Sequence, residues 1–535
     1  MTKSVGECRA DECIAQVGSL EQLRSADPVA GAIFLASPGR VGLFRWVRGD
    51  FSLAVERDPL AGRFVASRRA APESGAWVRD SSRLTPEMFG ARPGQADHYP
   101  YLAAAFDQLG DGITIELDGE YRTTRAIVVG QRANFRVVGR GRITSAAGTP
   151  VQYGYGILYL SECTDFELTT LTFDANRMGR TPREAPAHTV TFQSCHRFKV
   201  SGVRSVNAVC DGFHLFSAQP SVVETHCSDF EFLDCKADNC FRQGCSVIQG
   251  HRGIFRGGSY TNTNGTAPAA GIDLESDTDA PIGAISDIAF EGVTFANNFG
   301  FGLLVSTVAR PKRIVTSNCR FDHNRRGAIS WGATSGKITN PSLRGFTALA
   351  ERGAIDIPAG DGWQEGEGTL IESPQFTEVS SVRPENALVY VHSQAYGPVA
   401  ISRLSAPECG SIAGLHRNGS SLAGAKIRAS LGRIDGAIGV SGNGCAVRDN
   451  RIEAFFGSVI IATGENVQIT GNVLLQPRVN DGNGAIRVLG RGAVIEGNVL
   501  EASNASTAIT VAQAARMIRG NRATGFARAL AHGPD

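Results

Sequence analysis

Short segments of alternating apolar and polar residues, each opening with glycine, recur along most of the chain. An alternation with a period of two indicates strands whose side chains point in turn to two opposite faces. The segments begin at Gly212, Gly244, Gly271, Gly302, Gly327 and Gly353, and again at Gly436, Gly457 and Gly484. Where they can be followed, their spacing stays between 21 and 33 residues. Coils of unequal length without a recurring helix predict a parallel β-helix.

Two further repeats support stacked coils, because a residue type that recurs in successive coils stacks on itself. A Cys, two polar residues and a Phe recur at intervals of 32 residues, at Cys163, Cys195 and Cys227, with Phe166, Phe198 and Phe230. Asparagine recurs at intervals of 22, 26 and 23 residues, at Asn450, Asn472, Asn498 and Asn521. An amide both donates and accepts, so these asparagines predict a hydrogen-bonded ladder.

The pattern divides the chain into two parts. Residues 1–84 predict a small β-hairpin module, and residues 85–535 predict the β-helix. Residues 101–109 have helical apolar spacing and would cap the open end of the first coil, as a solenoid needs. About a dozen coils at ~4.8 Å each would make a rod of roughly 60 Å.

Composition excludes several functions. The 535 residues include 53 basic and 52 acidic ones, a net charge of +1, which argues against a nucleic-acid partner. No apolar stretch approaches the roughly 20 residues of a membrane-spanning helix, and the first residues contain no apolar run suited to a secretory signal. The 12 cysteines are too dilute for a disulfide scaffold, and those of the repeat fall in separate coils. We therefore expect mostly free thiols and no cysteine metal site.

The stretch from TPEMFGARPG to GEYRTTRAIVV resembles the opening of the pectate-lyase-like right-handed parallel β-helix superfamily, especially its tailspike and polysaccharide-depolymerase members. Phe89, Gly90, Ala91, Ala104, Gly119 and Tyr121 match that opening. Asp97, followed by His98, stands where such proteins often have a pair of aspartates. The resemblance covers roughly residues 85 to 525, and its specific motif is confined to the first forty positions.

This resemblance implies an all-β, right-handed, single-stranded parallel β-helix that acts on an extracellular or capsular polysaccharide. It also implies an extracellular or phage-associated protein, with a homotrimer by analogy with tailspikes. The superfamily contains hydrolases, lyases, epimerases and pure adhesins, so the fold does not fix the reaction.

Carboxylates concentrate in PAAGIDLESDTDA, residues 268–280. If Ile272 and Leu274 point into the coil, Asp273 and Glu275 must both point outward. Parallel stacking would bring residues 211–216, 242–249 and 271–277 into one patch on consecutive coils. That patch contains Asp211, His214, Arg242, Asp273, Glu275 and Asp277, and nearby coils could add Trp331, Asp322, His323, Arg325 and Asp356.

Hydrolysis by a carboxylate pair is the preferred function. Two residues at i and i+2 lie about 6.5–7 Å apart along a strand, near the spacing that admits an attacking water in an inverting glycosidase. Stacked like charges also raise one pKa, which supplies a protonated acid beside an ionised base. Asp273 and Glu275 would be that pair, with Asp211 beside them and His214 or Arg242 orienting the substrate. Asp277, Asp322, His323, Arg325 and the Trp331 ring would bind sugar.

Two other functions stay open. In a lyase, Arg242, or a calcium ion held by Asp273, Glu275 and Asp277, would neutralise a uronate while His214 removes its C5 proton. In a non-catalytic glycan-binding fibre, the acidic side chains would serve only solubility, and the DTD sequence would be turn chemistry. No cofactor is expected for hydrolysis.

Overall fold

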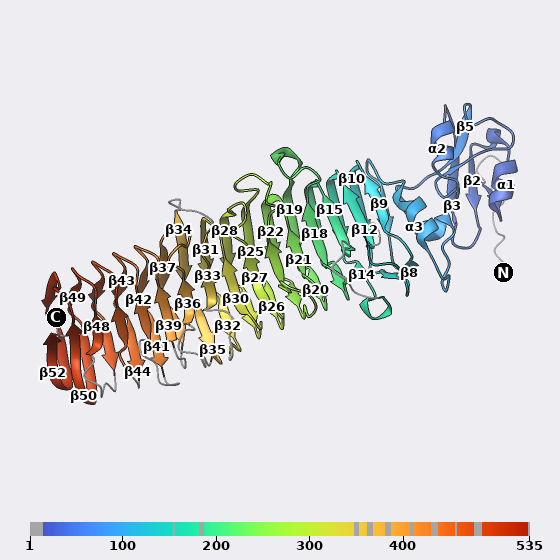
Figure 1. The fold of residues 1–535 in the computed structure, drawn as a ribbon. Helices are drawn as coiled ribbons and strands as arrows, with labels where there is room; N and C mark the ends of the chain where they lie inside the picture. Colours follow the sequence, from blue (N-terminus) through green and yellow to red (C-terminus); the bar gives the residue numbers. More distant parts are fainter. Residues whose placement is uncertain are drawn as a thin grey trace, which may run out of the picture.

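The protein is a rod of stacked coils with a small sheet module at its N-terminal end (Figure 1). The computed structural model describes residues 14–152, 156–180, 187–346, 353–360, 367–379, 387–406, 411–429, 437–454, 457–475 and 484–532. Within these residues, no helix is both long enough and apolar enough to cross a bilayer. The predicted all-β, right-handed parallel β-helix is confirmed.

The N-terminal module is one five-stranded sheet in the order β1-β2-β3-β5-β4, with β1 parallel to β2 and the other pairs antiparallel. Its strands are β1 (Ala15–Val17), β2 (Ala32–Leu35), β3 (Gly42–Arg48), β4 (Phe64–Val65) and β5 (Gly75–Arg79). Its helices are α1 (Leu20–Ser25), η1 (Pro28–Ala30) and α2 (Ser52–Glu56). Leu23, Phe44 and Trp77 belong to a core separate from that of the coils.

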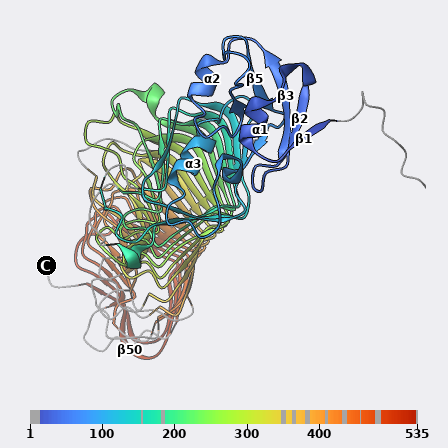
Figure 2. The same cartoon turned by 90° about the vertical axis from the view of Figure 1, so that its right-hand side faces the viewer.

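A helix closes the first coil, as the sequence predicts. After η2 (Pro86–Phe89), α3 spans Tyr99–Phe106 and begins two residues before the predicted range. Pro100 lies in its first turn, where a missing backbone N–H costs nothing. Leu102 and Phe106 are buried in the core of the coils, and Figure 2 shows α3 lying across the end of the stack.

Each complete coil contributes three strands, so the strands form three parallel columns. The first column contains β6 (Arg83–Leu84), β7 (Thr114–Glu116), β10 (Ala133–Val138), β13 (Thr164–Thr169), β16 (His196–Ser201), β19 (Cys227–Leu233), β22 (Gly250–Arg256), β25 (Ile285–Glu291), β28 (Lys312–Ser317), β31 (Ser335–Thr339), β34 (Gly368–Glu372), β37 (Val399–Ser402), β40 (Ser421–Ala423), β43 (Ala446–Arg448), β46 (Gln468–Thr470), β49 (Val494–Glu496) and β51 (Met517–Arg519). It is an open sheet, because β6 pairs only with β7 and β51 only with β49.

The second column follows the first around each coil. It contains β8 (Glu120–Thr123), β11 (Arg142–Ser145), β14 (Thr172–Asp174), β17 (Arg204–Val206), β20 (Lys236–Asp238), β23 (Ser259–Thr261), β26 (Thr294–Ala296), β29 (Arg320–Asp322), β32 (Ser342–Arg344), β35 (Gln375–Thr377), β38 (Ser405–Ala406), β41 (Lys426–Ala429), β44 (Arg451–Ala454) and β47 (Val473–Leu475). The short helices η3 (Arg177–Gly179) and η4 (Val223–Thr225) lie in longer turns.

The third column carries the glycine-led segments of the sequence. It contains β9 (Ile127–Gly130), β12 (Leu158–Ser161), β15 (Val190–Gln193), β18 (Phe213–Phe216), β21 (Cys245–Val247), β24 (Ile272–Leu274), β27 (Phe301–Val305), β30 (Gly327–Trp331), β33 (Gly353–Ile357), β36 (Ala387–Val391), β39 (Ser411–Leu415), β42 (Ile438–Val440), β45 (Ile460–Ala462) and β48 (Gly484–Val488). In the last coils, β50 (Val499–Val511) and β52 (Arg522–His532) continue both the second and the third column.

The rod is longer than the predicted 60 Å. The first column has 17 described strands, which at ~4.8 Å each give a stack of roughly 80 Å. The glycine-led segments mark only some of the coils, so counting them underestimates the length.

Ladders of identical side chains hold the coils together. The rings of Phe135, Phe166 and Phe198 stack with centroids 5.0 Å apart, and Phe230 follows at 5.7 Å. The asparagine ladder is also present: the Nδ2 atoms of Asn450, Asn472 and Asn498 each donate to the Oδ1 of the next asparagine at 2.9 Å. A shorter ladder that the sequence reading missed joins Asn298 to Asn324 at 2.8 Å.

A column of opposite charges runs along the outer face of the first column. Asp165, Arg197, Asp229, Arg252, Asp287 and Arg313 occupy one left-handed position, with φ between +50° and +56°, in six successive coils. Each arginine donates two hydrogen bonds to the aspartate of the preceding coil. These ion pairs join the side chains of adjacent coils at the kink that each coil makes there.

The nine described cysteines are free and buried. Cys163, Cys195 and Cys227 donate their thiol hydrogens to backbone carbonyls of their own and neighbouring coils. Cys8, Cys13 and Cys409 lie outside the described residues.

Replacing Asn472 by alanine should lower the free energy of unfolding by about 2–4 kcal/mol, because buried partners in the two neighbouring coils lose hydrogen bonds. Asn472 bonds to Asn450, to Asn498 and to the Val447 carbonyl. Urea unfolding measures the loss. Asn443→Ala is the control, since the exposed Asn443 accepts a single bond from the Glu465 N–H, and it should cost about 1 kcal/mol or less. Equal losses in both variants would contradict a stabilising ladder.

Candidate functional site

Four adjacent coils place titratable side chains together at strands β15, β18, β21 and β24, whose column is visible in Figure 1. We call this group the central cluster. It consists of His188, Asp211, His214, Arg242, Gln243, Ser246, Asp273 and Glu275. The stacked register brings them together, because Phe213, Cys245 and Ile272 are direct neighbours on successive coils.

Asp211 lies at the centre of the cluster and is completely buried. Its Oδ2 is 3.0 Å from His188 Nδ1 and accepts a 3.0 Å hydrogen bond from the Ser246 hydroxyl. Its Oδ1 accepts the Gln243 N–H at 3.2 Å and lies 3.5 Å from Arg242 Nε. The two carboxylate oxygens therefore face different partners.

The surroundings of Asp211 favour its ionised form. Burial alone would raise its pKa, but His188, Arg242 and His214 outweigh burial and hold the pKa below its ordinary value. A charged carboxylate is thus fixed inside the coil wall.

His214 projects from β18 and its ring stacks on that of His188, with centroids 3.8 Å apart and planes 9° from parallel. It is half-buried, and its Nδ1 has no hydrogen-bond partner. Burial first, and then the nearby His188 and Arg242, lower the pKa of His214 well below its ordinary value, although Asp211 opposes this shift. The Phe216 ring lies 4.9 Å from the His214 ring and is half-buried.

Asp273 takes the outward position on β24, in register with Ser246 and Leu304, but it is not exposed. Only 1% of the residue is accessible, so the expectation of a solvated carboxylate is wrong. Its Oδ2 accepts a 2.6 Å bond from Gln243 Nε2, while its Oδ1 is buried without a partner. Outward direction on a β-helix does not guarantee exposure, because side chains of neighbouring coils cover the wall.

Asp273 and Glu275 interact directly. Burial raises the pKa of Asp273 well above its ordinary value, and the charge of Glu275 and a hydrogen bond with it raise it further, against the opposing effect of Arg242. Glu275 is half-buried and closer to solvent. The separation of 6.5–7 Å expected from strand spacing does not hold for the carboxyl groups, since flexible side chains set their distance. The pair thus joins a buried acid of raised pKa to a more accessible acidic side chain.

Arg242 connects the two carboxylate groups of the cluster. Its pKa is raised, mainly by Asp211, with smaller contributions from Asp273 and Glu275. Its side chain is 24% exposed, so a cation reaches the surface next to the acidic pair. A negatively charged sugar could bind there.

Several predicted sugar-binding residues lie elsewhere. Trp331 is fully buried and its Nε1 donates to Thr369 Oγ1 inside the core, so it offers no ring to a ligand. Its strand β30 points Ser330 outward instead. The prediction failed because the alternation places Trp331 on the same inward face as Ile329.

The other four predicted residues are on the surface. Asp277 is exposed and accepts a 2.8 Å bond from Gln249 Nε2, at the edge of the central cluster. Asp322 ends β29 of the second column, where it pairs with His323 and Arg320 of its own coil. Arg325 is exposed and lies over the Phe299 ring at 5.4 Å. Within the part of the chain that the structure describes, none of these contacts joins Asp322, His323 or Arg325 to the central cluster.

His188 and Gln243 were missed by the sequence reading. Both stand two residues before a third-column strand, as Asp211 does. Aligning the coils on Val190, Phe213 and Cys245 would have placed His188, Asp211 and Gln243 at one position. The sequence contains this pattern, but it becomes visible only when the coils are aligned strand on strand. The strand that begins in APAHTV has no leading glycine, so its place in that alignment is not marked.

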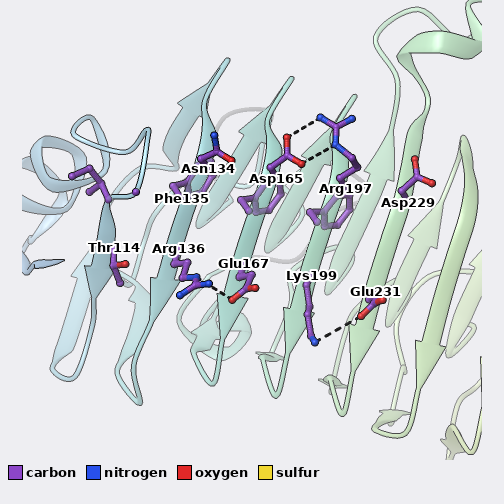
Figure 3. A pocket seen from close by; sticks show the side chains of 14 residues that line it. Thr114, Asn134, Phe135, Arg136, Asp165, Glu167, Arg197, Lys199, Asp229 and Glu231 are labelled. Carbon is purple, nitrogen blue, oxygen red and sulfur yellow. Dashed lines mark hydrogen bonds and ion pairs between the residues drawn. The ribbon is translucent and has the colours of Figure 1, made fainter. Parts of the chain in front are cut away.

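A hollow of about 770 Å³ lies on the outer face of the first column at β10, β13, β16 and β19. Figure 3 shows its charged side chains from successive strands pointing toward one another. Arg197 pairs with Asp165, Arg136 with Glu167, and Lys199 with Glu231. The pKa values of Asp165, Arg197 and Asp229 are shifted mainly by hydrogen bonds within exposed ion pairs. Buried titratable groups gather instead in the central cluster, which is therefore the candidate site.

Solved structures of similar architecture include three proteins with different functions. The tailspike protein gp49 of Acinetobacter baumannii bacteriophage Fri1, a capsular polysaccharide depolymerase, is 11% identical, with a TM-score of 0.37, over 86% of this chain and 76% of that one. PfbA, a surface adhesin of Streptococcus pneumoniae, is 12% identical (TM-score 0.42; 78% and 92% covered). The A-module of the mannuronan C-5 epimerase AlgE4 of Azotobacter vinelandii is 13% identical (0.34; 84% and 98%).

At these identities the likeness concerns the fold alone. No protein-family model matches the chain, and no curated protein sequence matches it. The chain shares the parallel β-helix of the superfamily that its opening resembles.

The raised pKa of Asp273 predicts a pH-dependent stability. The native state keeps a proton that the unfolded chain releases above about pH 4, so stability is lost as the pH rises from there through the folded pKa. Asp273→Asn cannot ionise. Its stability relative to the wild type should therefore be higher at pH 7 than at pH 4, as measured by urea unfolding at both pH values.

Asp287→Asn provides the opposite control. A hydrogen bond with Arg313 lowers the pKa of Asp287, so the native carboxylate stabilises the protein above its unfolded pKa and loses that effect as the pH falls. This variant should lose stability relative to the wild type at pH 7 more than at acidic pH. A constant difference between Asp273→Asn and wild type at both pH values would show that Asp273 is not held neutral.

Proposed function

We propose that the protein cleaves glycosidic bonds of an extracellular or capsular polysaccharide at the central cluster. The observation that carries this proposal is the burial of Asp273 directly against the more accessible Glu275, which raises the pKa of Asp273. Glycoside cleavage needs a carboxylic acid that stays protonated near neutral pH and can reach the sugar. In this pair Asp273 supplies the proton, and Glu275, the more accessible side chain, reaches the sugar.

Three residues of the central cluster have a role in hydrolysis. Glu275 contacts the glycosidic oxygen and passes it the proton that the pair holds, which gives the pair the general-acid half of the reaction. Gln243 positions Asp273, because its Nε2 donates to that carboxyl while its Oε1 accepts the Ala270 N–H at 2.9 Å. Water then attacks the anomeric carbon from the face turned to solvent and loses one proton to the solvent. The pair takes up a proton from solvent again, so the proton balance closes.

A second candidate is β-elimination on a uronic-acid polymer, favoured by Arg242. This partly exposed arginine beside Glu275 can pair with a uronate carboxylate and so acidify the neighbouring C–H bond. Elimination and hydrolysis leave different products. Elimination creates an unsaturated uronate that absorbs in the ultraviolet, whereas hydrolysis creates only new reducing ends.

We infer an extracellular or phage-associated setting, because capsular and secreted glycans lie outside the cell. A homotrimer, the arrangement implied by the tailspike resemblance, is proposed on the same basis. Light scattering of the purified chain measures the oligomeric state directly.

The test is incubation with a panel of neutral and acidic bacterial polysaccharides, with reducing ends and ultraviolet absorbance read in parallel. Hydrolysis predicts reducing ends alone. Glu275→Gln and Asp273→Asn should each lower the rate at least about 100-fold while glycan binding is kept, since both remove a transferable proton. Glu291→Gln is the control, because Glu291 lies on the first column and pairs with Arg256.

Each alternative has its own outcome. Reducing ends together with ultraviolet absorbance would replace hydrolysis by elimination. Binding without any product across the panel would favour a glycan-binding fibre. Full activity in both Glu275→Gln and Asp273→Asn would move the chemistry to another part of the molecule.

A further inference from the structure

The geometry points to a transition-metal site formed by His188, Asp211 and His214. One nitrogen of each imidazole and one oxygen of the carboxylate all lie within 4.8 Å of one another. Two imidazoles and one carboxylate are a three-ligand set that binds zinc with an open fourth position for water or substrate. This site goes beyond the proposed glycan cleavage, and it stands or falls independently of that activity.

The unused hydrogen-bonding capacity of the histidines supports a ligand. His214 Nδ1 is buried and has no partner, and His188 Nδ1 has none besides its 3.0 Å approach to Asp211. His188 is 8% exposed, so water does not readily satisfy its ring. Buried polar atoms in proteins are nearly always paired, and those that are not call for an unseen ion, water or function.

The carboxylate is oriented as a metal ligand should be. Oδ2 of Asp211 faces His188, whereas Oδ1 is held by the Gln243 N–H at 3.2 Å and approached by Arg242 Nε at 3.5 Å. Such outer partners fix the direction of a ligating carboxylate. Oδ2 also accepts the Ser246 hydroxyl at 3.0 Å, and its second lone pair can bind the metal. Arg242 thus contacts Oδ1 of Asp211, which is not the oxygen proposed to bind the metal.

The chemistry of the donors selects the metal. Imidazole nitrogen suits zinc, cobalt, nickel, copper and iron, whereas calcium prefers six to eight oxygen ligands. The cluster offers two imidazoles and a single carboxylate, so it favours a first-row transition metal over calcium. Because the two rings are stacked nearly parallel, one ring must turn for both nitrogens to meet the same ion. His214 is the half-buried ring and the one with room to turn.

The test is metal binding by the full-length chain. After removal of bound metal with a chelator, titration with Zn²⁺ should saturate at one ion per chain, and Co²⁺ should give the visible absorption of a site without thiolate ligands. His188→Gln and His214→Gln should each weaken binding at least tenfold. His251→Gln is the matched control, because His251 is also half-buried beside another histidine, His226, but lies in β22 of the first column.

Circular dichroism and the unfolding midpoint of each variant establish that it is folded. If His188→Gln does not fold, the His214→Gln result decides alone, because that side chain lies nearer the surface. Zn²⁺ affinity that is unchanged in the folded variants, or no saturable binding by the wild type, would overturn the site. A thiolate-to-cobalt band that persists in His214→Gln would assign the metal to cysteines and overturn it equally.

Discussion

In-register stacking of the coils is the constraint on which the rest of the structure depends. Parallel strands ~4.8 Å apart oblige each residue to meet the residue at the same position one coil later. Every ladder follows from this rule, whether it is built from phenylalanine rings, asparagine amides or ion pairs. The central cluster follows from it too, since Asp211 and Gln243 are 32 residues apart in sequence and bonded in space.

The central cluster shows how one wall of the coils can shift the pKa values of two buried aspartates in opposite directions. Asp211 and Asp273 are both buried, but the first is surrounded by two histidines and an arginine and the second by a glutamate and an amide. The pKa is therefore lowered for Asp211 and raised for Asp273. Gln243 links the two aspartates, because its backbone N–H donates to Asp211 and its side-chain amide donates to Asp273. Separated pKa values within one site are typical of acid and base roles.

The fold was predictable from the sequence because its signals repeat. The Cys-Phe spacing, the asparagines and the capping helix each identify a position that recurs or closes the stack, and all three are present in the structure. The site was only partly predictable. Asp211, His214, Arg242, Asp273 and Glu275 do come together.

The remaining features required information that alternation alone does not contain. Whether an outward residue is exposed depends on neighbouring coils, which is why Asp273 is covered. Trp331 was assigned to the surface by its size and not by its place in β30. His188 could be found only by aligning the coils.

The alternating aspartates and arginines on the outer face of the first column affect how such a chain can change in length. Aspartate and arginine alternate from coil to coil, so removing the coil of Asp229 would set Arg197 against Arg252. Removal or insertion of two neighbouring coils keeps each arginine next to an aspartate, whereas a change by one internal coil sets like charges side by side.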